Sequence, residues 1–210
     1  MDTTIADDPV RAFAEPPLID DAAELLASAP LHAIVYAFTS SSYVCGRADD
    51  ALLKQRLETR TRGIPVVISS AAAVVALKVL NATKLALVSP PWFSAEMDRQ
   101  GARYFQACGF DVVHNGPAGL PSDQQAIQPG DLFEWVRTHT PKSTQAVFIG
   151  GNGFRAVGVV KALEDILGIP VLTANQVSFW QALLLSGSQV TITNYGQIFN
   201  HRPPIDLSAK

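Results

Sequence analysis

Short apolar runs recur along the chain, and each is bounded by glycine, proline, serine or asparagine. Each run has the length of a β-strand, and most are apolar throughout rather than alternating with polar residues. Unbroken apolar strands are typical of a parallel sheet that is covered on both faces. The predicted strands are 31–38, 63–69, 84–90, 110–115, 146–151, 169–175 and 189–193.

Between these runs lie segments whose apolar residues recur at helical spacing. The predicted helices cover 48–61, 94–108, 130–138 and 155–167, with a shorter one at 19–28. Gly168 directly follows the segment 155–167, at the position where a glycine commonly ends a helix. Strands that alternate with helices predict an α/β protein with parallel sheets flanked by helices.

Two stretches of the chain are nearly the same. Gly-Ile-Pro-Val begins at Gly63 and again at Gly168, and each copy continues into small polar residues and an apolar helical stretch. The copies lie about half the chain apart, too far for a solenoid repeat, which indicates two related half-domains. We therefore predict two pseudo-symmetric lobes with a ligand cleft between them. The expected division is a polar lead with a short helix (1–30), a first lobe (31–92 with 190–200), a second lobe (93–189) and a tail (201–210).

Each half places polar turns at the carboxyl ends of its strands. Residues 39–42 (Thr-Ser-Ser-Ser) follow the first predicted strand, and residues 150–153 (Gly-Gly-Asn-Gly) follow its counterpart in the second half. Open α/β sheets bind ligands at this end, and free backbone N–H groups at a helix start hold anions. The pair of turns therefore favours a small carboxylate or dicarboxylate ligand, although each turn alone is more typical of a simple helix cap.

Composition excludes several classes of protein. The net charge is −3 and the isoelectric point is near 5.8, whereas a surface that binds nucleic acid is typically basic. Lys78 and Lys84 interrupt the most apolar region, so no membrane span is predicted. The acidic N-terminus is not a signal or transit peptide, and two cysteines do not make a disulfide framework. We therefore expect a cytoplasmic protein.

The glycine turn also fits the dinucleotide-binding pattern G-x-G-x-x-A over residues 151–156. That pattern requires an acidic residue about 20 positions later, and no Asp or Glu lies between Asp165 and Asp206. The four histidines are scattered without ligand spacing. The sequence therefore predicts neither a nicotinamide or flavin cofactor nor a bound metal.

The order of these features resembles the aspartate/glutamate racemase superfamily, in particular its maleate cis-trans isomerase and arylmalonate decarboxylase branch. The resemblance covers roughly residues 31–195. It implies two α/β lobes, no cofactor and no metal, and a homo-oligomer, because the family often forms dimers or larger assemblies. The residues that carry it are the two Gly-Ile-Pro-Val units, Tyr36-x-x-Thr39-Ser40, Pro90-Pro91-Trp92-Phe93, the 151–156 turn, Asn175-Gln176 and Trp180.

In that superfamily a cysteine follows the first strand of each lobe, and the two thiols face the substrate from opposite sides; the decarboxylases keep only the second. The corresponding positions here are Phe38 and Gly151, which carry no thiol, hydroxyl or titratable group. The resemblance therefore leaves the catalytic residues unknown. Cys45 is a nearby thiol, and Tyr36 and Tyr43 are weaker candidates for proton transfer. A structural role is the more common one for a cysteine such as Cys45.

The turns and the resemblance together predict the substrate-binding residues. Trp92 either walls the predicted cleft or packs inward as part of a rigid turn, and Arg155 either pairs with a carboxylate or is simply an exposed residue at a helix start. The family usually begins with a strand whose loop helps to hold the substrate, and a truncated start would account for the polar residues 1–30 here. The predicted substrate-binding residues are Thr39, Ser40, Ser41, Trp92, Gly151, Asn152, Gly153 and Arg155.

The predicted function is that of a cofactor-independent isomerase, racemase or decarboxylase acting on a small carboxylate or dicarboxylate. The missing cysteines keep two alternatives open. One is a non-catalytic member that binds a small carboxylate, as a regulatory or sensing protein. The other is a protein that only folds and associates.

Overall fold

A computed structural model describes residues 9–203, so residues 1–8 of the predicted lead and 204–210 of the predicted tail lie outside the described residues. Within 9–203, no helix is long and apolar enough to span a membrane. The elements in chain order are α1 (Pro9–Ala12), α2 (Leu18–Leu26), β1 (Ile34–Tyr36), α3 (Thr39–Cys45), α4 (Arg47–Arg60), β2 (Val66–Ile68), α5 (Ser69–Val79), β3 (Lys84–Ser89), α6 (Ala95–Ala107), β4 (Asp111–Pro117), α7 (Pro129–His139), β5 (Ala146–Ile149), the 3₁₀ turn η2 (Val157–Val159), α8 (Val160–Leu167), β6 (Val171–Thr173), α9 (Ala174–Leu185) and the 3₁₀ turn η3 (Gln197–Asn200).

The described strands form two sheets, and every strand pair in both sheets is parallel. The smaller sheet pairs β1 with β2, with Ile34 opposite Val66. The larger sheet has the strand order β4-β3-β5-β6, with Val147 of β5 opposite Val171 of β6. The predicted α/β architecture with parallel sheets flanked by helices is therefore confirmed.

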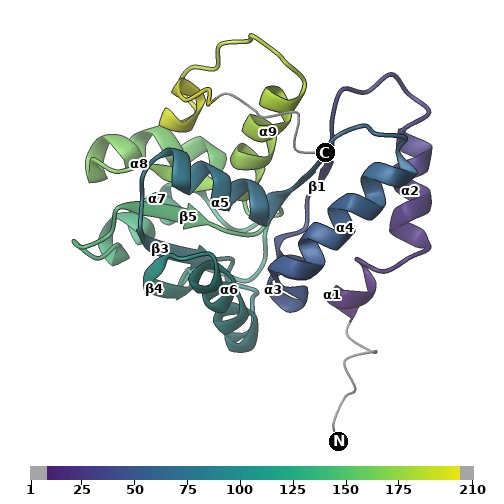
Figure 1. The fold of residues 1–210 in the computed structure, drawn as a ribbon. Helices are drawn as coiled ribbons and strands as arrows, with labels where there is room; N and C mark the ends of the chain where they lie inside the picture. Colours follow the sequence, from purple (N-terminus) through teal and green to yellow (C-terminus); the bar gives the residue numbers. More distant parts are fainter. Residues whose placement is uncertain (1–8, 204–210) are drawn as a thin grey trace, which may run out of the picture.

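Two helices related by the sequence repeat join the sheets. α5 follows the first Gly-Ile-Pro-Val strand and α9 follows the second, and they pack against each other. α9 contacts β1 and β2 of the smaller sheet as well as β6 of the larger one. In Figure 1, α2 and α4 lie on the side of β1, whereas α7 and α8 lie on the side of β5. The repeat therefore places its second helices where the two halves of the molecule meet.

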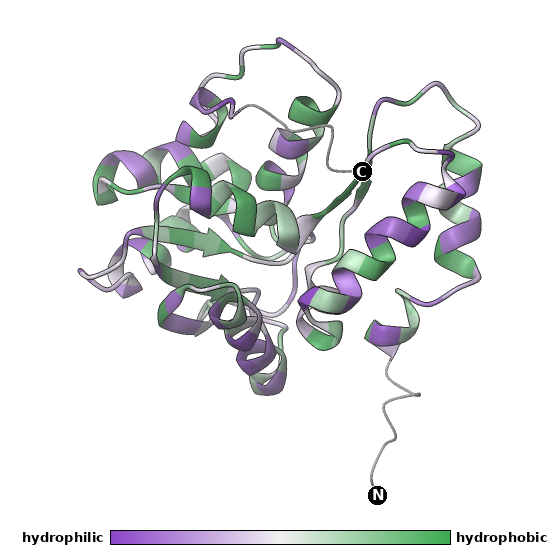
Figure 2. Cartoon of the chain, viewed as in Figure 1, coloured by the Kyte–Doolittle hydropathy of each residue, from purple (hydrophilic) through white to green (hydrophobic). Residues whose placement is uncertain are grey.

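The larger sheet forms the centre of the core. Leu85 and Leu87 of β3, Phe148 of β5 and Leu172 of β6 are fully buried. β3 and β5 are largely hydrophobic in Figure 2, whereas α4 and α6 alternate between hydrophilic and hydrophobic residues along their length. Burial on both faces explains why the strands carry unbroken apolar runs.

The strand pairings differ from the predicted lobes in two places. β3 lies in the range assigned to the first lobe, but it pairs with β4 and β5 of the larger sheet. The predicted strand 189–193 has no regular secondary structure, and the segment 190–200 contacts α8 and α9. The strand pairings therefore do not change at residue 92, where the predicted boundary between the lobes lies. The division into lobes stays a prediction.

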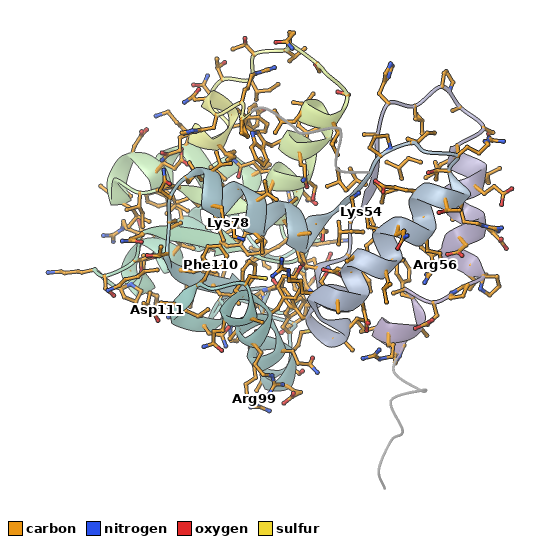
Figure 3. The ribbon with its side chains drawn as sticks, viewed as in Figure 1. Lys54, Arg56, Lys78, Arg99, Phe110 and Asp111 are labelled. Carbon is orange, nitrogen blue, oxygen red and sulfur yellow. The ribbon has the colours of Figure 1, made fainter. Side chains whose placement is uncertain are left out.

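Helix α2 turns its apolar side outward. Leu18 and Leu25 are 81% and 75% exposed, whereas Asp20 on the opposite side is only 7% exposed. Asp20 accepts a hydrogen bond of 2.9 Å from the guanidinium of Arg56 on α4, and Figure 3 shows Arg56 on the side of α4 that faces α2. This ion pair therefore lies beside a buried apolar cluster to which Ala23 of α2 and Leu57 of α4 both belong.

Candidate functional site

The candidate site lies where the carboxyl ends of four strands meet. α3 begins at Thr39 directly after β1, and the glycine turn follows β5. The side-chain oxygen of Asn152 accepts a hydrogen bond of 3.2 Å from the backbone N–H of Thr39. In return, the hydroxyl of Thr39 accepts one of 3.2 Å from the N–H of Gly151. The first turns of the two halves, far apart in sequence, are therefore in direct contact.

The second turns of both halves meet the same asparagine. The amide nitrogen of Asn152 donates to the hydroxyl of Ser69 at 3.3 Å and to the side-chain oxygen of Asn175 at 2.9 Å. Asn175 donates back to the backbone carbonyl of Asn152. We call the set Thr39, Ser69, Asn152 and Asn175 the Asn152 junction. Because Ser69 opens α5 and Asn175 lies in the first turn of α9, the junction ties the start of three helices to the glycine turn.

Within the protein, hydrogen bonds of the junction already occupy the backbone N–H groups that are predicted to bind an anion. The N–H groups of Thr39 and Gly151 are both engaged within the protein. Ser41 donates to the carbonyl of Phe38 and shares a hydrogen bond of 2.8 Å with the hydroxyl of Tyr36. Ser40 is 8% exposed and has no hydrogen-bond partner among the described residues for its hydroxyl.

Two consecutive glycines after β5 are closely packed, and the second of them has no room for a side chain. A Cβ added at Gly150 would stand 3.1 Å from the hydroxyl of Tyr43. A Cβ added at Gly151 would overlap the ring of Pro90, and Gly151 also has a φ of +80°, which residues with a Cβ rarely adopt. The glycine turn therefore packs directly against α3 on one side and against the turn after β3 on the other.

The remaining predicted substrate-binding residues lie outside the junction. The ring of Trp92 is half-buried and packs edge-on against Phe154, with centroids 5.7 Å apart. This contact agrees with the inward-packing alternative for Trp92. Arg155 is exposed and has no ion pair or hydrogen bond within the described residues, and Gly153 has no hydrogen bond there either.

The candidate proton-transfer groups differ in their distance from the junction. The backbone carbonyl of Tyr36 accepts a hydrogen bond of 3.2 Å from the hydroxyl of Ser69. Cys45 is at the far end of α3 from Thr39, about 9 Å along a helix of this rise, and burial raises the pKa of its thiol. Burial likewise raises the pKa of Tyr36 to about 12, and burial also raises the pKa of Tyr43. Tyr43 is 4% exposed and its hydroxyl lacks a hydrogen-bond partner in the described part of the chain. A thiolate or phenolate is therefore disfavoured at all three positions.

A cavity of about 670 Å³ lies beside the glycine turn. Asn152, Gly153 and Arg155 line it from the turn, and Asn175 lines it from α9. Its outer wall comes from the segment between α9 and η3. Thr39, Ser40, Ser41, Trp92 and Gly151 are not among the residues that line it.

Several residues of this region carry no signal in the sequence. Ser178 donates to Ser69 at 2.8 Å and so supports the junction from α9, but it lies inside an apolar helical stretch. Tyr195 and Phe199 line the cavity from a segment without helical or strand periodicity. By contrast, the sequence repeat does point to Ser69 and Asn175, because both lie at the starts of the helices that follow the two Gly-Ile-Pro-Val strands.

Within residues 9–203, no group of three or more His, Cys, Asp or Glu side chains lies close enough together to hold a metal ion. The hydrogen bonds that define the junction are made by hydroxyls, side-chain amides and backbone groups.

Fold and junction together define a two-lobed parallel α/β protein whose polar strand ends meet where the lobes join. A family model described as arylmalonate decarboxylase matches residues 17–199, and the chain belongs to this family. The predicted resemblance to the arylmalonate decarboxylase and maleate isomerase branch is thereby confirmed.

Individual proteins show the same likeness. The maleate isomerase of Geobacillus stearothermophilus is 24% identical over 148 residues, which are 69% of this chain and 58% of that protein. A variant of arylmalonate decarboxylase with associated sulfate superposes with a TM-score of 0.82 at 19% identity, covering 95% of this chain and 85% of that one. A maleate cis-trans isomerase variant of Nocardia farcinica with a covalently bound succinylcysteine intermediate gives 0.79 at 18% identity, covering 94% and 93%. The chain thus spans less than two thirds of the curated relative, while the fold extends over most of both solved structures.

Proposed function

We propose that this chain is a cofactor-independent isomerase, racemase or decarboxylase that acts on a small carboxylate or dicarboxylate. Membership of the arylmalonate decarboxylase family supports this reaction class. The observation that carries the proposal is the meeting of four strand-end turns at the Asn152 junction. In α/β proteins the carboxyl ends of the strands are the usual place for substrate.

The junction supplies donors of the kind that a carboxylate requires. The side-chain oxygen of Asn152 occupies the N–H of Thr39 in the way that a substrate carboxylate oxygen would. Substrate binding would then displace the side chain of Asn152 and expose the N–H of Thr39, whose direct neighbour in the chain, Ser40, carries an unengaged hydroxyl. The N–H of Gly151 would become a further donor where the hydroxyl of Thr39 turns away from it. Backbone donors that point at one oxygen also stabilise the enolate-like charge that develops when a proton or CO₂ leaves an α-carbon.

A second candidate function is carboxylate binding without turnover. The observation that favours it is the overlap of any side chain at Gly151 with Pro90, because the resemblance assigns Gly151 to a catalytic cysteine position. Phe38, the other such position, carries no titratable group either. The succinylcysteine intermediate of the Nocardia farcinica relative shows how directly a thiol takes part in that enzyme.

Proton–deuterium exchange distinguishes the two functions. The purified chain is incubated in heavy water with maleate, aspartate, glutamate and substituted malonates, and the α-carbon signals are followed by NMR. Exchange, isomerisation or loss of CO₂ supports the enzyme. Line broadening of a ligand without any exchange supports the binding protein, and silence in both measurements rejects both functions.

The binding site itself is tested by one substitution and its control. Ser40→Ala should weaken binding of the active ligand by about 1–3 kcal/mol, the range for a hydrogen bond to a charged group. Ser143→Ala removes an exposed hydroxyl that has no hydrogen bond within the described residues, and it should leave the affinity unchanged. Equal affinity in wild type and Ser40→Ala would remove Ser40 from the site.

A further inference from the structure

We propose that the cavity beside the glycine turn is a second ligand site, which binds an amphipathic organic anion. The cavity has a volume of about 670 Å³, within the range of about 300–1,000 Å³ that is usual for ligands of drug size. A four-carbon dicarboxylate would fill only a small part of it. The cavity shares Asn152 and Asn175 with the Asn152 junction, but Thr39 and Ser69 do not line it. The proposed site therefore lies beside the junction, and it does not depend on the function proposed for the junction.

Most of the cavity wall is apolar, and several of its large side chains are exposed. Phe179 on α9 and Tyr195 between α9 and η3 are each 51% exposed, and Val157 of η2 is 45% exposed. Phe199 contacts Phe179 edge-on, with ring centroids 6.3 Å apart. Large apolar side chains that gather around a concave surface are typical of a ligand site, because a ligand removes them from water.

The polar side chains that line the cavity favour a ligand with a negative charge. The amides of Asn175 and Gln176 are already engaged with Asn152, Thr173 and the backbone of Tyr195. Arg155 is the one charged residue among the described lining residues, and it has no partner in the described part of the chain. Its guanidinium can hold a carboxylate, sulfonate or phosphate through paired N–H donors. One unpaired cation beside an apolar wall fits a ligand with one anionic head and a hydrocarbon or aromatic body.

The cavity also touches the residue that closes the junction. Asn152 lines the cavity and, through its side-chain oxygen, covers the N–H of Thr39. Asn175 lines the cavity and holds the amide of Asn152. A ligand in the cavity therefore contacts the two asparagines that join the lobes.

Two fluorescent probes with the same ring body test the charge requirement. Anilinonaphthalene sulfonate carries an anionic head, and N-phenylnaphthylamine lacks it. We expect both probes to bind the wild-type protein. Arg155→Gln should raise the dissociation constant of the sulfonate by about three- to tenfold, the range for an exposed charge-assisted contact, and should leave that of the neutral probe unchanged.

Matched variants locate the binding. Arg99→Gln removes an exposed arginine of α6, labelled in Figure 3, and should affect neither probe. Phe179→Ser and Tyr195→Ser should each weaken both probes, whereas Leu25→Ser, on the exposed face of α2, should weaken neither. Near-ultraviolet circular dichroism checks that every variant keeps the native fold.

Three results would overturn the proposal. They are failure of the wild type to bind the sulfonate probe, equal affinity for that probe in wild type and Arg155→Gln, and a loss of binding in Leu25→Ser that matches the loss in Phe179→Ser. Adding maleate separates this site from the junction, because displacement of the sulfonate by maleate in direct competition would place both ligands in one site and reject a second one.

Discussion

The side-chain oxygen of Asn152 accepts a hydrogen bond of 3.2 Å from the backbone N–H of Thr39, at the first residue of helix α3. The donor opens the helix that follows β1 of the smaller sheet, and the acceptor belongs to the turn after β5 of the larger sheet. One amide therefore links the two sheets at the place where both present their carboxyl ends.

Replacing Asn152 by alanine should destabilise the protein. The substitution removes the hydrogen bonds to Thr39, Ser69 and the side chain of Asn175 at once. We expect the free energy of unfolding to fall by about 1–3 kcal/mol, measured by urea denaturation. Asn200→Ala is the control, since Asn200 is exposed and its side chain has no hydrogen bond within residues 9–203. Equal losses in both variants would contradict a linking role for Asn152.

Any side chain at position 151 should be poorly tolerated. Gly151→Ala places a Cβ against Pro90 at a backbone conformation that favours glycine, and we expect a loss of about 2–4 kcal/mol in thermal or chemical unfolding. Gly153→Ala is the matched control two residues on, because its Cβ would meet only the mobile end of the Gln124 side chain at 3.3 Å. Gly151→Ala should recover part of its loss when Pro90→Ala is added. Similar stability of the two single variants would show that the contact relaxes freely.

Stability should depend on pH through Asp50. Its carboxyl accepts hydrogen bonds from Tyr104 at 2.7 Å and Ser42 at 2.9 Å, and burial raises its pKa from 3.8 to about 6. Because the folded pKa is the higher one, the stabilisation belongs to the neutral form. It is complete below about pH 4 and is lost as the pH rises through about 6, by roughly 3 kcal/mol.

The Asp50 effect is measured as a difference between pH profiles. Asp50→Asn should lower stability overall but flatten the decline of unfolding free energy between about pH 4 and pH 7. Asp111→Asn, an exposed carboxylate without an ion pair among the described residues, should leave the profile of the wild type unchanged. A decline in Asp50→Asn as steep as in the wild type would refute the assignment.

Glu164 should hold the outer wall of the cavity in place. One carboxylate oxygen accepts from the N–H of Val171 at 3.1 Å, and the other accepts from the N–H of Gln197 at 2.9 Å. Glu164→Ala should speed hydrogen exchange of these two amides by about tenfold or more. Glu134→Ala, on the exposed side of α7, serves as control. Unchanged exchange at Gln197 would mean that η3 is held by its apolar contacts alone.

The sequence predicts the repeated units best. The Gly-Ile-Pro-Val strands and their following helices become β2 with α5 and β6 with α9, because apolar runs, glycine and proline act locally. Residues 189–193 alternate valine or isoleucine with threonine and yet form no strand. Strand propensity is expressed only beside a partner strand, and here Arg202 binds the carbonyls of Ser188 and Val190 instead.

The candidate site is partly predictable for the same reason. Thr39, Gly151 and Asn152 meet because parallel strands bring their carboxyl ends together. That Asn152 would occupy the N–H of Thr39, or that Pro90 would cover Gly151, depends on side-chain packing between segments far apart in sequence. The cavity depends on Tyr195 and Phe199, whose positions follow from contacts with α8 and α9 and not from any local pattern.

The packing of Pro90 against Gly151 also constrains the history of this sequence. A lineage that carries proline at 90 cannot gain a side chain at 151 by one substitution without losing stability, so the residue at 90 must change first or in the same step. Positions 90 and 151 should therefore vary together among descendants of a common ancestor. Proline at position 90 would then mark the related proteins in which position 151 must remain glycine.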